Sequence, residues 1–125
     1  MTALIAFIIA MIILALTVFN VTPSHTGYIR AEDPVPMTRV FLTKYGPTGN
    51  PMANGEMPHL GAVAVSDRTI PFGTKIFINN QEYIVKDRTA KWVHEVKGFT
   101  VDIYSEETQE EMVRFGRQVA MVEIK

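Results

Sequence analysis

Short apolar runs separated by turn-forming residues constrain the fold of this chain more than any other feature. The runs are rich in Val, Ile, Phe and Tyr, and several alternate between apolar and polar residues, as strands do. They lie at residues 37–45, 62–66, 74–79, 82–87, 99–105 and 118–124. Loops rich in Gly, Pro, Asn or charged residues are expected at residues 46–61 and 88–98. Many short strands accompanied by a single helical pattern predict a mainly-β fold, a small β-barrel.

Two segments between the expected strands carry specific local signals. Asn79 and Asn80 separate two runs and predict a tight hairpin turn, because asparagine tolerates positive φ. Residues 106–116 are the one helical pattern, with Ser105 as the expected N-cap and Gly116 as the expected end. Acidic residues crowd the first turn of that helix, where the helix dipole favours negative charge.

The N-terminal segment has a different composition from the rest of the chain. Residues 3–19 are apolar and contain no charge, glycine or proline, and this length approaches the roughly 20 residues that a membrane-spanning helix needs. We expect a transmembrane helix over residues 1–21, a tether over residues 22–36 and a globular domain over residues 37–125. A cleaved signal peptide and a buried core helix are the alternatives. An uncleaved anchor is favoured over a signal peptide, because no Lys or Arg precedes the apolar run.

Composition excludes several classes of function. The 125-residue chain has no cysteine, which excludes disulfides, thiolate metal sites and a cysteine nucleophile. The formal net charge of −1 does not favour binding to nucleic acid. His59 and His94 lack the spacing of a metal pair, and we expect Ser66 to have no nearby histidine that could activate it as a nucleophile. No cofactor or metal is expected.

Three aspartates are the candidate chemical groups. Asp67 and Asp87 each follow an apolar run, and Asp102 lies within one, with apolar neighbours on both sides. If the three converge at one mouth of the barrel, their mutual repulsion raises at least one pKa. A carboxylic acid that stays protonated near neutral pH can protonate a glycosidic oxygen. The alternative is that Asp67 and Asp87 are turn residues that accept hydrogen bonds from backbone amides.

From Thr38 to Lys125 the chain resembles the three-aspartate (3D) domain. This domain occurs in membrane-bound lytic murein transglycosylases of the A type and in stationary-phase and phage muralytic proteins. The matching stretches are "TKYGPTGNPMANG", "GAVAVSDRTIPFGTKIFI", "YIVKDR" and "GFTVDIYSEETQEEMVRFGRQVAMVEI". The resemblance implies a six-stranded double-psi β-barrel related to expansin-like domains. It also implies that Asp102 is the acid/base and that Asp67 and Asp87 shape its surroundings.

Aromatic, polar and charged residues elsewhere in the domain are candidate substrate contacts. Tyr45 and Trp92 are expected to stack on sugar rings, and Thr48 to donate a hydrogen bond to the substrate or to form a turn with Asn50. Arg88 is a further expected substrate contact, and it stands where many family members have threonine followed by two glycines. Its charge is expected to lower the pKa of nearby carboxylates. Four cations near one loop are either solvated or attract anionic wall polymers; they are Lys86, Arg88, Lys91 and Lys97.

Together these features predict a membrane-anchored enzyme that degrades peptidoglycan and faces the periplasm or the cell wall. The implied reaction is that of a lytic transglycosylase, which cleaves the bond between N-acetylmuramic acid and N-acetylglucosamine and leaves a 1,6-anhydro product. One acid/base group suffices for this reaction. A non-catalytic, expansin-like module that binds wall glycans is the alternative, and a hydrolase is a third reading.

Overall fold

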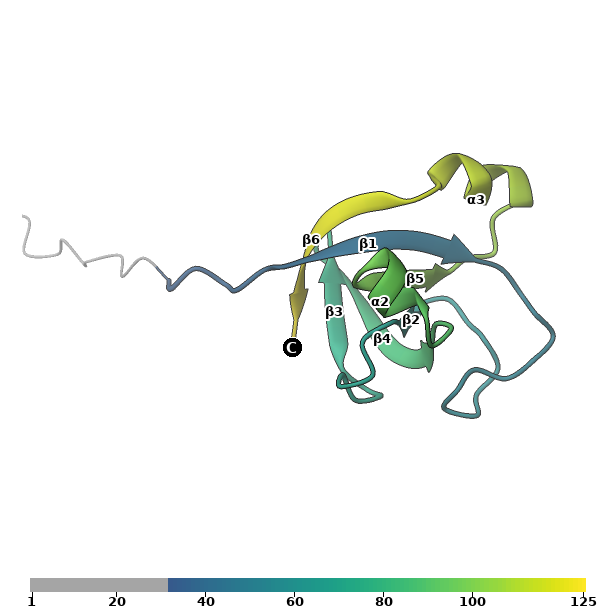
Figure 1. Ribbon diagram of the computed structural model, residues 1–125, viewed down its shortest axis with the longest axis horizontal. Helices are drawn as coiled ribbons and strands as arrows, with labels where there is room; N and C mark the ends of the chain where they lie inside the picture. Colours follow the sequence, from purple (N-terminus) through teal and green to yellow (C-terminus); the bar gives the residue numbers. More distant parts are fainter. Residues whose placement is uncertain (1–31) are drawn as a thin grey trace, which may run out of the picture. The chain divides into compact units, whose positions relative to one another are not determined.

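Six strands close into a barrel in the part of the chain that the structure describes (Figure 1). The structure is a computed structural model that describes residues 32–125. The expected transmembrane helix and most of the expected tether lie outside the described residues. Within the described part, no helix combines the length and the apolar character that crossing a bilayer requires. Residues Pro34–Lys125 form one compact unit.

The strands and two short helices follow one another along the described chain in a mixed order. They are β1 (Thr38–Tyr45), β2 (Ala62–Val65), β3 (Lys75–Ile78), β4 (Gln81–Arg88), α2 (Val93–Lys97), β5 (Thr100–Tyr104), α3 (Gln109–Phe115) and β6 (Gln118–Ile124). Around the barrel the order is β1-β5-β2-β4-β3-β6. The β1–β5 and β2–β4 pairs are parallel, and the other pairs are antiparallel. The mainly-β fold and the small barrel predicted from the sequence are confirmed.

Alternate residues of every strand fill the barrel with aliphatic side chains. The buried core consists of Val40, Leu42, Val63, Val65, Ile76, Ile78, Val85, Val101, Ile103 and Val122. Each such side chain contributes roughly 1.5–3 kcal/mol when it leaves water. Because successive strand residues point to opposite faces, the residues between these core positions lie on the outside of the barrel wall. Asp102 lies between Val101 and Ile103, so its place in an apolar run reflects an outward-facing position.

The β3–β4 hairpin has the turn that its two asparagines predict. Asn79 and Asn80 have φ angles of 49° and 64°, both in the left-handed region. Two consecutive residues with positive φ match the twist of a tight hairpin, and asparagine tolerates this region better than most residues. Ile78 and Gln81 pair directly across the turn.

The helices differ from the sequence prediction in two ways. Helix α2 lies in the segment expected to be a loop, and its five residues and missing side-chain N-cap leave little sequence signal. Helix α3 begins after Thr108, whose hydroxyl accepts a hydrogen bond from the backbone N–H of Glu111. The predicted cap at Ser105 is wrong, because that side chain accepts from Glu107 in the turn that leaves β5.

Candidate functional site

Four neighbouring strands place one residue each at the same level of the barrel wall. Thr43 of β1 pairs with Asp102 of β5, and Asp102 pairs with Ala64 of β2. Ala64 pairs in turn with Asp87 of β4. At a strand spacing of about 4.8 Å, the two aspartate backbones are roughly 10 Å apart. The small Ala64 side chain between them leaves a hollow on the wall.

A β-bulge determines which residue of β4 joins this row. Val63 pairs with Val85, but the next residue of β2, Ala64, pairs with Asp87, so the register skips Lys86. Bulges commonly redirect side chains beside functional sites. Without the extra residue, Lys86 would occupy the level of Asp102 in place of Asp87.

The row forms the floor of a pocket of about 430 Å³. Its walls come from the loop over residues 46–61 and from the segment that contains α2. The lining residues are Thr43, Tyr45, Thr48, Asn50, Pro51, Pro58, Ala64, Asp87, Arg88, Thr89, Ala90, Trp92, Val93, Lys97, Thr100, Asp102 and Arg117. Two of the three aspartates, Asp87 and Asp102, meet in this pocket. Asp102 lies on the outer side of β5, because Val101 and Ile103 face the core, and the bulge brings Asp87 of β4 to the same level.

Asp102 is a partly buried carboxyl group on the floor of this pocket. Burial raises its pKa, the hydrogen bond from the Thr43 hydroxyl at 2.8 Å opposes this, and the negative charge of Asp87 raises it further. The net pKa lies above the ordinary value for aspartate. A carboxyl group of this kind is suited to hold a proton and to deliver it to a bound molecule.

Asp87 is held in place by three donors. Its carboxylate accepts from the backbone N–H groups of Ala53 at 2.9 Å and Arg88 at 2.8 Å, and from the Tyr45 hydroxyl at 3.4 Å. Burial and the negative charges of Asp87 and Asp102 raise the pKa of Tyr45 well above its usual range. Tyr45 therefore stays a neutral donor beside the two carboxyl groups at ordinary pH.

Asp67 does not join the other two aspartates in the pocket lining. Its carboxylate accepts from the backbone N–H of Thr69 at 2.9 Å and from the Thr69 hydroxyl at 2.7 Å. The Thr69 hydroxyl, then the Thr69 amide, and then the nearby charges of His94 and Arg88 hold the Asp67 pKa below its ordinary value. Asp67 thus has the geometry of a turn residue that accepts a hydrogen bond from a backbone amide, which was the alternative expected for it.

Arg88 belongs to the pocket lining, but its guanidinium makes its contacts in the β2–β3 loop. It donates to the carbonyl of Ile70 and lies 4.4 Å from the ring centroid of Phe72. Its charge lowers the pKa of Asp67, whereas burial, Thr43 and Asp87 determine the shift of Asp102. The causes of the shift in the Asp102 pKa are therefore burial, Thr43 and Asp87, and they do not include Arg88.

The other sequence-predicted contacts line the pocket. Trp92 precedes α2 and is 54% exposed, and the ammonium of Lys97 lies 5.6 Å from its ring centroid. Thr48 accepts a hydrogen bond from the backbone N–H of Asn50 at 3.2 Å, so it forms a turn in the pocket wall. Sequence reasoning missed Thr43 and Ala64, since their importance depends on which strands are neighbours in the barrel.

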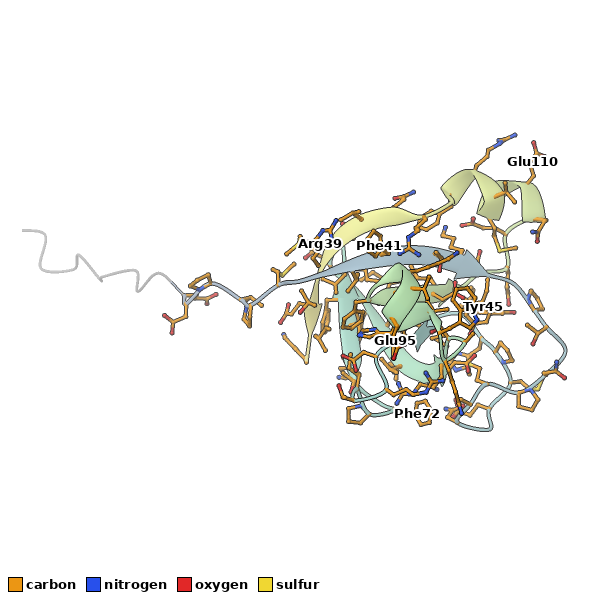
Figure 2. The ribbon with its side chains drawn as sticks, viewed as in Figure 1. Arg39, Phe41, Tyr45, Phe72, Glu95 and Glu110 are labelled. Carbon is orange, nitrogen blue, oxygen red and sulfur yellow. The ribbon has the colours of Figure 1, made fainter. Side chains whose placement is uncertain are left out.

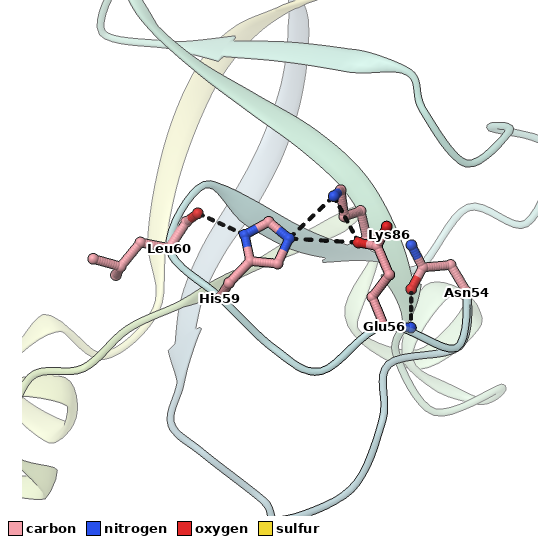
Figure 3. A network of polar contacts seen from close by, with 5 residues as sticks. All are labelled: Asn54, Glu56, His59, Leu60 and Lys86. Atoms are coloured by element: carbon pink, nitrogen blue, oxygen red, sulfur yellow. Dashed lines mark hydrogen bonds and ion pairs between the residues drawn. The ribbon is translucent and has the colours of Figure 1, made fainter.

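A polar network fastens the 46–61 loop to the barrel (Figure 3). The ammonium of Lys86 lies 2.7 Å from the Glu56 carboxylate and 3.0 Å from Nε2 of His59. The backbone N–H of Asn54 donates to the Lys86 carbonyl at 3.1 Å. Lys86 therefore holds the pocket wall in position instead of standing free among the four cations grouped in the sequence.

Helix α2 is attached to the barrel by a serine–histidine pair. The Ser66 hydroxyl lies 2.8 Å from Nδ1 of His94, and it accepts from the Thr100 backbone N–H at 2.7 Å. The expectation that Ser66 has no histidine beside it is wrong, because the fold brings α2 over the end of β2. Ser66 is only 2% exposed, so the pair fastens the wall that carries Trp92 and does not present a nucleophile.

No metal site accompanies the two carboxyl groups in the described residues. Within residues 32–125, no three histidine or acidic side chains are grouped closely enough to hold an ion. His59 and His94 instead serve the loop and the helix just described. Comparison of the chain with models of protein families and with curated proteins finds no match.

Proposed function

We propose that this chain is a membrane-anchored enzyme of the three-aspartate type that cleaves peptidoglycan glycan strands as a lytic transglycosylase. The observation that carries the proposal is Asp102, a partly buried carboxyl group with a raised pKa on the floor of an open pocket. The pocket volume of about 430 Å³ lies in the range of small-molecule sites. In this proposal residues 1–21 anchor the chain, and the barrel faces the periplasm or the cell wall.

In the proposed reaction Asp102 acts first as an acid and then as a base. Its proton goes to the glycosidic oxygen as the bond from that oxygen to the anomeric carbon of N-acetylmuramic acid breaks. The 6-hydroxyl of the same sugar then forms a bond to the anomeric carbon and returns its proton to Asp102. Water is not consumed, and the product carries a 1,6-anhydro ring. Asp87 supports the acid form because its negative charge disfavours ionisation of Asp102.

The barrel topology supports the finer fold assignment that the family resemblance implies. The order β1-β5-β2-β4-β3-β6 contains two parallel pairs, β1–β5 and β2–β4, joined by the antiparallel β2–β5 pair. We assign this closed, mixed arrangement to the double-psi class. In that assignment the two parallel pairs form the wall that carries the pocket.

The proposed sugar contacts come from the pocket walls. Trp92 offers an exposed ring face and Tyr45 a neutral hydroxyl beside Asp87, both suited to an uncharged sugar. Thr48 and Asn50 add polar groups on the opposite loop. Because Trp92 is the only tryptophan of the chain, its fluorescence reports directly on occupation of this pocket.

Product analysis tests the proposal. The full chain in mild detergent is incubated with purified murein sacculi, and the soluble products are identified by mass spectrometry. We expect muropeptides that end in 1,6-anhydro-N-acetylmuramic acid. Reducing-end products would replace the transglycosylase with a hydrolase, and the absence of any soluble product from a folded chain would contradict cleavage.

A non-catalytic module that binds wall glycans is the second candidate, and the position of Asp67 favours it. One of the three aspartates serves a turn outside the pocket, so the pocket holds only two carboxyl groups. A binding module would sediment with sacculi and change its Trp92 fluorescence, but it would release nothing. The Asp102→Asn variant separates the two candidates. If the chain is an enzyme, the variant should lose cleavage. If the chain is a binding module, the variant should bind sacculi about as well as the parent chain.

A further inference from the structure

The outer side of β6 and the chain that enters β1 expose apolar side chains to water. We call this surface the β6 face, and it consists of Met37, Val119 and Met121 together with Arg39 and Phe77. The side chains of Met37, Val119 and Met121 are 49–56% exposed. Met37 and Met121 also line a hollow of about 320 Å³ with Phe77. Contiguous exposed apolar side chains on a small domain mark an interaction surface.

Cations lie among these apolar side chains. Arg39 pairs directly with Met121 across β1 and β6, and its guanidinium lies 5.2 Å from the ring centroid of Phe41. Figure 2 shows Arg39 and Phe41 along the same side of β1. Among residues 32–125, Arg39 has no carboxylate partner. Two acidic side chains flank Phe77, and each is paired with a lysine: Glu123 with Lys125 at 2.9 Å and Glu82 with Lys75 at 3.3 Å.

The position of the tether indicates what covers this face. Met37 is the last residue before β1 and lies on the β6 face, so the residues that lead back along the sequence toward the apolar segment at 3–19 join the barrel at this face. A domain anchored by that segment stays within a tether length of the bilayer. Methionine and valine side chains that can enter the interface, next to an arginine that can reach headgroups, have the composition of an interfacial surface.

We propose that the β6 face docks on a bilayer surface that carries anionic headgroups. This inference uses the expected anchor but not the proposed glycan chemistry. In the barrel order β1-β5-β2-β4-β3-β6, β6 and β2 are separated by two strands on either side. Ala64 of β2 lies at the centre of the pocket floor, so the middle of the pocket is across the barrel from β6, while the edge of the pocket reaches Arg117 just before β6.

A single fluorescent label tests this docking in the full chain. The chain has no cysteine, so Met121→Cys gives one site for an environment-sensitive dye on the β6 face. The matched control is Leu60→Cys, which replaces a 62%-exposed apolar residue just before β2. Both labelled chains are reconstituted into phosphatidylcholine vesicles with and without phosphatidylglycerol. Vesicle flotation reports anchoring separately, and circular dichroism confirms that each chain is folded.

We expect the Met121 label to brighten about twofold and shift to the blue in vesicles with phosphatidylglycerol, and the Leu60 label to stay unchanged. Added salt should weaken the response, because it screens the attraction of Arg39 to headgroups. Arg39→Glu should remove most of the response, whereas Lys91→Glu, a matched change at an exposed lysine near the pocket, should preserve it.

Four results would overturn the docking proposal. The first is a floating chain whose Met121 label does not respond, and the second is an equal response from both labels. The third is a Met121 response that grows with the ratio of protein to lipid, since this would assign the β6 face to a second copy of the chain. A folded chain that does not float would remove both the anchor and the docking.

Discussion

Asp67 follows β2 and Asp102 lies in the middle of the neighbouring strand β5, and the barrel changes the acidity of these two aspartates in opposite directions. Asp67 follows β2 and accepts two hydrogen bonds from Thr69, which lowers its pKa. Asp102 lies within β5, where burial and the charge of Asp87 outweigh the single hydrogen bond from Thr43 and raise its pKa. One carboxyl group is adapted to remain charged and the other to hold a proton.

This difference follows from where each aspartate lies relative to its strand. At Asp67 the chain turns away from β2, so the backbone amides of the turn are free to donate to the carboxylate. At Asp102 the backbone amides serve the β-ladder, so the side chain has fewer donors in the pocket. The proposed enzyme would therefore use the end of one strand for stability and the middle of another for proton transfer.

Removing each carboxylate in turn should give the largest difference in activity between the Asp67 and Asp102 variants. Asp102→Asn should lower release of anhydro-muropeptides by about 10²–10⁴-fold, as expected for loss of a general acid/base. Asp67→Asn should retain activity within a few-fold, because its carboxylate does not line the pocket. The measurement is the initial rate of soluble product release from sacculi at equal amounts of folded protein. Equal losses from the two substitutions would contradict the division of roles.

Filling the floor of the pocket should block the substrate without changing either aspartate. Ala64→Leu places a large side chain between Asp102 and Asp87, and it should weaken glycan binding by about tenfold or more. Binding is measured by the change in Trp92 fluorescence. Ala64→Ser is the control, because it keeps the volume small, and circular dichroism and thermal melting monitor the overpacking of a buried position. Undiminished binding by a folded Ala64→Leu chain would place the glycan elsewhere.

The two aspartates should give opposite pH dependence of stability. The raised pKa of Asp102 stabilises the fold below the unfolded pKa of about 3.9, and this contribution is lost as pH rises through the folded pKa. Asp102→Asn should therefore gain stability relative to the parent chain as pH increases toward neutrality. Asp67, with its lowered pKa, contributes above the unfolded value and loses that contribution as pH falls through its folded pKa.

Thermal melting of the parent chain and both variants between acid and neutral pH measures these effects. Asp67→Asn should be less stable than the parent near neutral pH by under about 1 kcal/mol, since the group is partly exposed, and the difference should vanish in acid. Parallel pH profiles for Asp67→Asn and Asp102→Asn would refute the opposite shifts.

The smallest expected effect concerns the donor to Asp102. Thr43→Val removes the hydroxyl that favours the ionised carboxylate, so the pKa of Asp102 should rise further. The alkaline limit of activity should then move to higher pH by up to about one unit. Thr43→Ser retains a hydroxyl and should keep the parent profile. An alkaline limit that moves to lower pH in Thr43→Val would show that the Thr43 hydroxyl does not favour the ionised form of Asp102.

The sequence predicted the strands better than the surroundings of the aspartates. Alternating apolar residues located all six strands within a few residues, because burial of one strand face leaves a local pattern. The two asparagines also predicted their hairpin turn. Helix α2 was missed, since a helix this short depends on tertiary contacts such as the Ser66–His94 hydrogen bond.

Local sequence patterns could not predict which residues form the site, because the strand pairings that bring them together join distant segments of the chain. Thr43 and Ala64 reach Asp102 only through strand pairings between distant segments, and Asp87 joins the row through a bulge. The sequence could mark three aspartates as unusual, but it could not say which of them share a face. The turn at Asp67 was foreseeable from the residue type, whereas its separation from the pocket required the barrel order.

The most direct test of the account is the titration of individual carboxyl groups. Carbon-13 NMR of the isotopically labelled full chain in detergent can follow the side-chain carboxyl carbons of Asp67 and Asp102, each assigned by its Asn variant. We predict that Asp102 titrates above and Asp67 below the model-peptide value of about 3.9. An Asp102 titration at or below that of Asp67 would contradict the claim that the pocket raises the pKa of Asp102.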